Sequence, residues 1–389
     1  MSPDTLSPAA PQAPPGDGKQ TLSAEEGTSS RAKPKRLVSL DAFRGLAVLG
    51  MLLVNNKALG PWTPSQLTHA SWSEGVHAAD VVYPWFLLIV GVAIPYSFAS
   101  SRARGVAPLR QLGRTLTRAI VIVLLGVLVN SSYARHPLFD LGVLQLIGFA
   151  YLFGAMLYGL PRPARAGAAA LLLLGHWAAL RFVPVPGGVP HAFTETHNLV
   201  VHLNTIYLDQ LGLSNLPSVA TTTALVLIGT LFGDLIRGGD EARSRTARTL
   251  LLWGAVMLVV GLLWSLDQPM VKRLWTSPYI LFAAGTGAMV LSLCYWLIDG
   301  KGYRAWCYPL VVLGRNAITA FVLPILVNIY LLDGWRWPGT TRSVGQTLLG
   351  WLTNHLGAGP GGLTFTLGFL VCWWLVFFAM YRKRVFLRI

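Results

Sequence analysis

The run VSLDAFRGLAVLGMLLVNNKAL at residues 38–59 decides the fold, because apolar residues dominate a stretch long enough to cross a bilayer. A hydrocarbon core of ~30 Å needs about 20 helical residues. Further runs of this kind lie near residues 78–99, 112–130, 139–160, 166–183, 218–236, 247–266, 278–298, 308–332 and 363–381. Only helices or closed barrels satisfy backbone polar groups in lipid. The sequence therefore predicts an all-α integral membrane protein, a bundle of about ten transmembrane helices.

The composition also favours a membrane protein. The 389 residues are 53% hydrophobic and 12% charged, about half the charged fraction of a soluble domain. A net charge of +15 would suit nucleic acid in a soluble chain, but in an apolar chain basic residues mark cytoplasmic loops. We therefore expect no nucleic-acid partner. The scattered Cys294, Cys307 and Cys372 predict neither a disulfide framework nor a metal site.

The ends of the chain indicate its organisation and orientation. Residues 1–36 are rich in Pro, Ser, Ala and Gly, which predicts a disordered cytoplasmic tail ahead of one transmembrane domain at residues 37–389. The tail lacks the apolar segment of a signal peptide. Lys and Arg number 22 on the side that holds both termini and 7 on the other side. This bias predicts that both termini lie in the cytoplasm.

Polar residues inside an apolar span usually face a cavity or a partner. The first run carries Asp41, Arg44 and Asn55, which fall within about 60° of one another around a helix. Asp41 and Arg44 are spaced i, i+3 and can neutralise each other near the cytoplasmic interface. Asn55 lies near the outer end of the span and is the stronger functional candidate.

The stretch HASWSEGVHAAD at residues 69–80 is the richest in chemistry. A histidine held near an aspartate can act as a general base at neutral pH. Eleven residues of continuous helix would separate His69 from Asp80 by roughly 16 Å, so direct pairing requires a break, for which Gly75 is the candidate. Spacing alone also allows His69 to be a solvated or capping residue. The i, i+8 spacing of His69 and His77 does not favour a shared metal.

A basic stripe and two amides within apolar runs complete the candidates. Arg110, Arg114 and Arg118 recur every four residues and so share one helix face. That face suits either anionic headgroups or a phosphate, because guanidinium forks bind phosphate oxygens bidentately. Gln145 and Asn316 can bind a ligand or only join helices. The sequence contains no Walker A loop, GxSxG elbow or HExxH motif.

Several of these segments together resemble the heparan-α-glucosaminide N-acetyltransferase family, and the chain looks like a bacterial member of it. The matching segments are SLDAFRGL (39–46), VNN (54–56), HASW (69–72), ADVVYPWF (79–86), GVLQ (142–145), LWTS (274–277), YWLID (295–299) and GRNA (314–317). The resemblance covers roughly residues 36–384 and rests on the order and spacing of the motifs.

The resemblance implies a multi-pass acyltransferase of the bacterial inner membrane. Such an enzyme moves acetyl from cytoplasmic acetyl-CoA to the amine of a glucosamine-type sugar on the other side. By the matching motifs, His69 takes the position of the catalytic histidine, and Asn55 and Asp80 take those of its supporting residues. The segment between Asn55 and His69 is longer here than in the lysosomal member of the family, which is a departure at the acceptor pocket. The family is compatible with a homodimer.

Roles follow for the individual residues. His69 accepts a proton from the attacking amine, Asn55 stabilises the oxyanion or orients the acceptor, and Asp80 holds the histidine tautomer. The remaining candidates are Arg114, Arg118, Arg44, Gln145 and Asn316 for acetyl-CoA, and Trp72 and Trp275 for the acceptor. Expected partners are acetyl-CoA, an amino sugar and membrane lipids. The alternatives are an amino-sugar permease, against which the absence of an internal repeat counts, and a scaffold without turnover.

Overall fold

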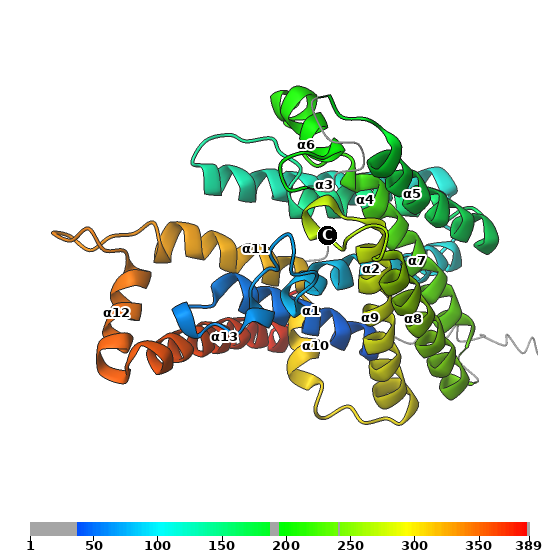
Figure 1. The fold of residues 1–389 in the computed structure, drawn as a ribbon. Coiled ribbons are helices and arrows are strands. Elements are labelled where there is room, and N and C mark those ends of the chain that lie inside the picture. Colours follow the sequence, from blue (N-terminus) through cyan, green and yellow to red (C-terminus); the bar gives the residue numbers. More distant parts are fainter. Residues whose placement is uncertain (1–36, 187–193, 240–241, 387–389) are drawn as a thin grey trace, which may run out of the picture. The chain divides into compact units, whose positions relative to one another are not determined.

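The computed structural model describes residues 37–186, 194–239 and 242–386. Their regular structure is helical apart from one isolated antiparallel bridge between Arg336 and Ser343, which confirms the all-α class. The α-helices are α1 (Val38–Asn56), α2 (Ala78–Ala103), α3 (Pro108–Ala134), α4 (Val143–Leu157), α5 (Arg162–Phe182), α6 (Leu199–Leu203), α7 (Ser218–Gly238), α8 (Arg243–Trp264), α9 (Ser277–Cys294), α10 (Tyr308–Gly314), α11 (Ala317–Val327), α12 (Val344–Leu356) and α13 (Ala358–Arg382) (Figure 1).

Short 3₁₀ and π segments join these helices. They are η1 (Gly60–Trp62), η2 (Ser65–Leu67), η3 (Asn204–Leu208), η4 (Asp209–Leu211), η5 (Lys272–Leu274), η6 (Tyr295–Gly300) and η7 (Asn328–Leu332). The predicted cytoplasmic tail at residues 1–36 lies outside the described residues, and the cytoplasmic location of the termini stays a prediction.

Each of the ten predicted runs contains a helix, but the helices differ in their ability to span a bilayer. Among the described residues, seven are long and apolar enough: α1, α2, α3, α7, α8, α9 continued by η6, and α13. An eighth span results if α10 and α11, which are bent by 77° at their junction, count as one. Helix α4 has only 15 residues, and α5 carries Arg162, Arg165 and Arg181. The membrane bundle is confirmed, and the count of ten stays a prediction.

Helix α7 is the most deeply buried of these spans, with 83% of its most apolar 18-residue stretch buried. It packs along α2, and α8 packs along α9 (Figure 1). The backbones of α2 and α7 approach closely because glycines face each other: a Cβ on Gly91 would overlap the carbonyl oxygen of Val226, and a Cβ on Gly229 would overlap that of Leu88. Small residues allow this kind of close packing between membrane helices.

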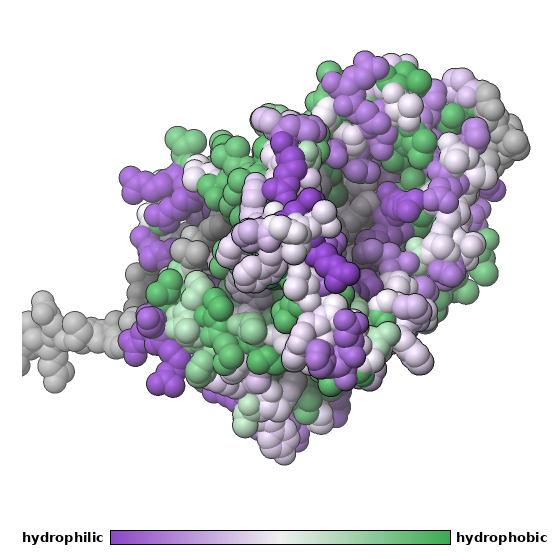
Figure 2. All heavy atoms as spheres, turned by 90° about the vertical axis from the view of Figure 1, so that its left-hand side faces the viewer, coloured by the Kyte–Doolittle hydropathy of each residue, from purple (hydrophilic) through white to green (hydrophobic). Residues whose placement is uncertain are grey.

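The outer helices expose apolar side chains. Only 28% of the most apolar 18-residue stretch is buried in α3 and in α8, and only 17% in α13. On α3 the exposed apolar residues recur every four positions, at Leu112, Leu116, Ile120, Leu124 and Leu128. Exposed apolar side chains also lie beside hydrophilic ones on the face shown in Figure 2. Surfaces of this kind suit contact with lipid.

The contact between α1 and α10 leads to a stability prediction. A Cβ on Gly314 would overlap the carbonyl oxygen of Asp41, and a Cβ on Gly45 would overlap that of Leu310. We expect Gly314→Ala to force these backbones apart and to lower stability by about 1–3 kcal/mol. The thermal unfolding midpoint of the detergent-solubilised protein measures this effect. Gly368→Ala on α13 is the control, because nothing lies within 4 Å of its added Cβ. Equal midpoints for the two variants would contradict the packing.

Candidate active site

The segment before α2 folds back on itself and brings His69 to Asp80. Residues 69–77 are not helical, and Gly75 has a φ of 82°, a left-handed conformation that favours glycine. Helix α2 begins only at Ala78. The break that direct pairing requires is therefore present, and Asp80 lies in the first turn of α2, where the helix dipole stabilises an anion.

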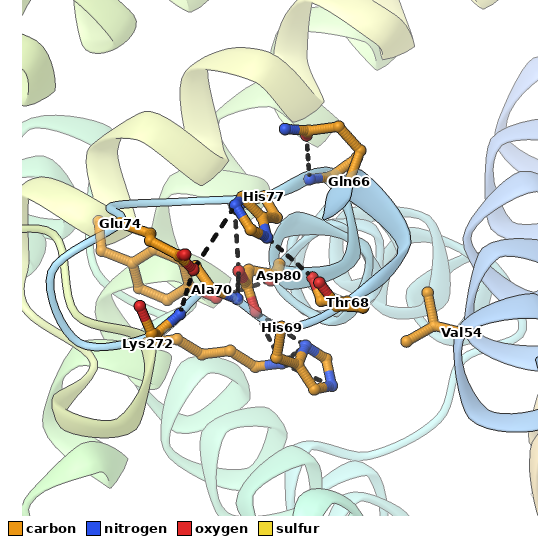
Figure 3. A network of polar contacts seen from close by, with 12 residues as sticks. Val54, Gln66, Thr68, His69, Ala70, Glu74, His77, Asp80 and Lys272 are labelled. Atoms are coloured by element: carbon orange, nitrogen blue, oxygen red, sulfur yellow. Dashed lines mark hydrogen bonds and ion pairs between the residues drawn. The ribbon is translucent and has the colours of Figure 1, made fainter. Parts of the chain in front are cut away.

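Asp80 holds His69 by one ring nitrogen (Figure 3). His69 Nδ1 lies 2.8 Å from Asp80 Oδ1, and the backbone N–H groups of Ala70 and His77 donate to Asp80 Oδ2 at 3.1 and 3.0 Å. Asp80 is 1% exposed, whereas the His69 side chain is 52% exposed. A carboxylate accepts only, so Nδ1 is the donor, and in the neutral ring Nε2 then carries the lone pair. This is the arrangement of a histidine base with an orienting aspartate.

Lys272 joins this pair from η5, between α8 and α9. Its Nζ lies 3.3 Å from Asp80 Oδ1 and 2.9 Å from His69 Nδ1. Burial lowers the pKa of Lys272 below its ordinary value, and the Asp80 carboxylate opposes that shift. From the sequence alone, Lys272 is one of the seven basic residues on the side opposite the termini. The one signal that could have drawn attention to it is the LWTS segment that begins at Leu274.

His69, Asp80 and Lys272 line a cavity of about 710 Å³. Trp72 and Trp275, the two residues expected to bind the acceptor, line the same cavity. The other lining residues are Ala70, Ser71, Glu74, Gly75, Tyr83, Leu141, Gly142, Val143, Leu146, Glu195, Val200, Val201, Asn204, Asn215, Val271, Arg273 and Leu274. Aromatic faces beside polar and charged groups suit a polar ligand with an apolar ring face.

Asn55 and Gln145 lie together, but in a second cavity of about 270 Å³. Gln145 is 2% exposed, and neither its Oε1 nor its Nε2 has a hydrogen-bond partner. Buried amides are normally satisfied, so this one indicates a ligand or water. Val143 lines both this cavity and the His69 cavity, whereas Asn55 is not among the described residues that line the latter.

The arginine stripe lies at the opposite end of α2 and α3. Arg114 and Arg118 line a third cavity of about 660 Å³ together with Arg104 and Arg110, and the Arg118 guanidinium lies 5.7 Å from the centre of the Tyr151 ring. From Arg118 to Gly126, which lines the second cavity, α3 rises about 12 Å. The two cavities therefore follow one another along α3.

The last two candidates, Arg44 and Asn316, bond to other residues of the chain. Arg44 forms an ion pair with Asp41 at 3.2 Å. Asn316, at the bend between α10 and α11, donates to the carbonyl of Val385 at 3.2 Å. Neither lines any of the three cavities above. Within the described part of the chain, no cluster of three or more His, Cys, Asp or Glu could hold a metal ion.

Comparison with known proteins identifies the family. A family model described as heparan-alpha-glucosaminide N-acetyltransferase, catalytic, matches residues 36–261, which is more than half of the chain. The chain belongs to this family. The heparan-alpha-glucosaminide N-acetyltransferase of Homo sapiens is 25% identical over 92% of this chain and 60% of its own length. The Mus musculus protein of the same name is 25% identical over 81% of this chain and 59% of its own length.

The match with these two heparan-alpha-glucosaminide N-acetyltransferases covers only part of their length. The chain spans about 60% of the length of these two relatives. The family match contains His69, Asp80, Asn55 and Gln145 but ends before Lys272. The expected family membership is confirmed, and the roles of the individual residues are proposals.

Proposed function

We propose that this chain is a transmembrane acetyltransferase that moves acetyl from acetyl-CoA to the amine of a glucosamine-type sugar. The observation that carries the proposal is the His69–Asp80 pair, joined at 2.8 Å, at the wall of a cavity of about 710 Å³. Family membership supports the reaction class, because both relatives are named as N-acetyltransferases of a glucosaminide.

The acceptor occupies the His69 cavity in this proposal. Its amine attacks the thioester carbonyl while His69 Nε2 takes the proton, and Asp80 holds the ring and stabilises the imidazolium that forms. The faces of Trp72 and Trp275 cover the apolar side of the sugar ring. Trp275 is held in place by an edge-to-face contact with Tyr83, at 5.1 Å between ring centres, so its orientation is set before the sugar binds.

The donor enters from the arginine end of α3. Arg114 and Arg118 bind its phosphates, and the amides of its pantetheine arm match the unpartnered Gln145 and the nearby Asn55. Side chains at Gly126 or Gly142 would crowd the Gln145 Oε1, so these glycines keep room for the amide. The thioester then reaches the His69 cavity past Val143, which borders both cavities.

Orientation and location follow from charge and apolar surface. The excess of Lys and Arg beside the arginine end of α3 supports a cytoplasmic location for that end, where it meets acetyl-CoA, and an outer location for His69. We place the chain in a bacterial cytoplasmic membrane, with the exposed apolar side chains of α3 and α13 in contact with lipid or with a second copy.

The broken span α10–α11 favours one competing function. Discontinuous helices with polar residues at the break are typical of transporters, and Asn316 lies at such a break of 77°. A permease would carry glucosamine across the membrane of proteoliposomes without consuming acetyl-CoA.

The deciding experiment measures both the acetylation of glucosamine and its transport. Purified protein in detergent is given radiolabelled acetyl-CoA and glucosamine, and we expect labelled N-acetylglucosamine and free CoA in equal amounts. Uptake of labelled glucosamine into proteoliposomes without acetylation would favour the permease and reject the transferase.

The donor site makes a separate prediction. Arg114→Ala and Arg118→Ala each remove a phosphate contact, so we expect KM for acetyl-CoA to rise about tenfold, with kcat little changed. Steady-state kinetics over a range of acetyl-CoA concentrations measures this. Arg245→Ala is the control, because Arg245 is an exposed arginine of α8 that lines none of the three cavities. An unchanged KM in both variants would place the phosphates elsewhere.

A further inference from the structure

The ammonium group of Lys272 lies over the face of the His69 ring. Its Nζ is 2.9 Å from Nδ1 and 3.4 Å from Nε2. These two nitrogens flank a single ring carbon, so an atom at those two distances in the ring plane would collide with the ring. Nζ must therefore lie above the plane. Lys272 and the Asp80 carboxylate approach His69 from different directions (Figure 3).

Lys272 has more N–H donors than its two neighbours, His69 and Asp80, can accept. An ammonium has three N–H groups and no acceptor, and Asp80 Oδ1 accepts one of them at 3.3 Å. The proton of His69 Nδ1 is directed to Asp80, so Nδ1 has no lone pair to offer, and the Nε2 lone pair lies in the ring plane. The adjacent cation, Arg273, is paired with Glu195. Lys272 therefore presents positive charge to the cavity beside the base.

We propose that Lys272 stabilises the oxyanion of the tetrahedral intermediate in acetyl transfer, an inference that rests on the proposed function. The sugar nitrogen forms a bond to the carbonyl carbon, and the carbonyl π electrons move to oxygen, which then carries the negative charge that Lys272 contacts. The proton on nitrogen passes to His69 Nε2. As the carbonyl re-forms, the C–S bond breaks and the sulfur takes that proton, leaving N-acetylglucosamine and CoA.

Distances favour Lys272 over Asn55 for this role. The attacking nitrogen must lie within hydrogen-bond reach of Nε2, and the carbonyl oxygen is two bonds from that nitrogen in the intermediate. Nζ, at 3.4 Å from Nε2, is next to this position. Asn55 instead lines the second cavity with Gln145. The Lys272 side chain is 28% exposed, and in such a partly water-excluded site its charge acts strongly on a developing anion.

The first test separates turnover from binding. We expect Lys272→Met to lower kcat about 100-fold while KM for glucosamine stays within about threefold. Lys272→Arg restores a cation and should recover most of kcat. Lys57→Met is the matched control, because Lys57 donates to the Val54 carbonyl at 2.9 Å and lines none of the three cavities described above. A loss confined to KM would make Lys272 an acceptor-binding residue and overturn the proposal, as would an unchanged kcat.

The second test uses pH and does not depend on the methionine variant folding. Burial lowers the pKa of Lys272, so the active ammonium is lost, and kcat falls, as the pH rises through a pKa below that of an ordinary lysine. Lys272→Arg stays charged and should not show this alkaline decline. The titratable and charged groups that line the cavity with Lys272 are His69, Asp80, Glu74, Tyr83, Glu195 and Arg273. Behind them, the Tyr279 hydroxyl donates to the Asp80 carbonyl at 2.7 Å. The same decline in both proteins overturns the proposal.

The experiments distinguish failure of the proposed function from failure of the role given to Lys272. If the parent protein transfers no acetyl to glucosamine, the proposed function itself is wrong, and the role of Lys272 falls with it. If the parent transfers acetyl and Lys272→Met does so at the same rate, only the role of Lys272 is wrong.

Discussion

His69→Ala is expected to lower kcat for acetyl transfer to glucosamine by about 10³-fold or more, while acetyl-CoA still binds. Among the described residues, His69 is the one histidine of this cavity wall that an aspartate holds by a ring nitrogen, and the variant removes it. Its cost in stability should be small, because the side chain is 52% exposed. Single-turnover transfer from labelled acetyl-CoA measures the chemical step directly.

The matched control for this variant is His136→Ala. His136 is exposed, and its Nδ1 contacts only the neighbouring Pro137 carbonyl, at 3.2 Å. It should transfer acetyl at the parental rate. A His69→Ala variant with half the parental rate or more would mean that His69 is not the base.

The same experiment distinguishes two chemical routes. In direct transfer, His69 takes a proton and never carries the acetyl group, so incubation with labelled acetyl-CoA alone should leave the protein unlabelled. A stable label that appears with donor alone and disappears in His69→Ala would instead indicate an acetyl-histidine intermediate and would rule out direct transfer.

The helical fold was predictable because hydropathy is a local property. Every apolar run contains a helix, and the first, at residues 38–59, contains α1. Bends were not predictable in this way. The run at 308–332 looks like one span, yet the backbone breaks at Asn316, with φ −122° and ψ 39°. Nothing in the summed hydropathy of a run records where its backbone departs from a helix.

The site was predictable only where its residues are close in the chain. His69 and Asp80 are 11 positions apart, and Gly75 between them indicated a break in the helix that lets the two side chains meet. Lys272 is 203 positions from His69, so only the packing of the bundle brings them together. Asn55 and Gln145 were both candidates, but their common cavity depends on how α1, α3 and α4 converge, which one sequence does not reveal.

Asp80→Asn should reduce kcat by about 10³–10⁴-fold and also lower the stability of the protein. The carboxylate accepts from His69 Nδ1, from two backbone N–H groups and from Lys272. An amide has one accepting oxygen, and its NH₂ group must face one of these donors. The ring then loses its fixed tautomer, and Lys272 loses its counter-charge. The wrong tautomer presents a protonated Nε2, which cannot take the proton of the attacking amine.

The loss of stability should be about 2 kcal/mol, the usual contribution of a hydrogen bond to a charged group, and a thermal unfolding midpoint measures it. Asp209→Asn is the matched control, because Asp209 is exposed in η4, accepts from Ser214 and lines none of the three cavities described above. If Asp80→Asn unfolds at a lower temperature but keeps its kcat, Asp80 serves only to cap α2. A fall in kcat in protein that is still folded at the assay temperature is the result that a role in holding His69 requires.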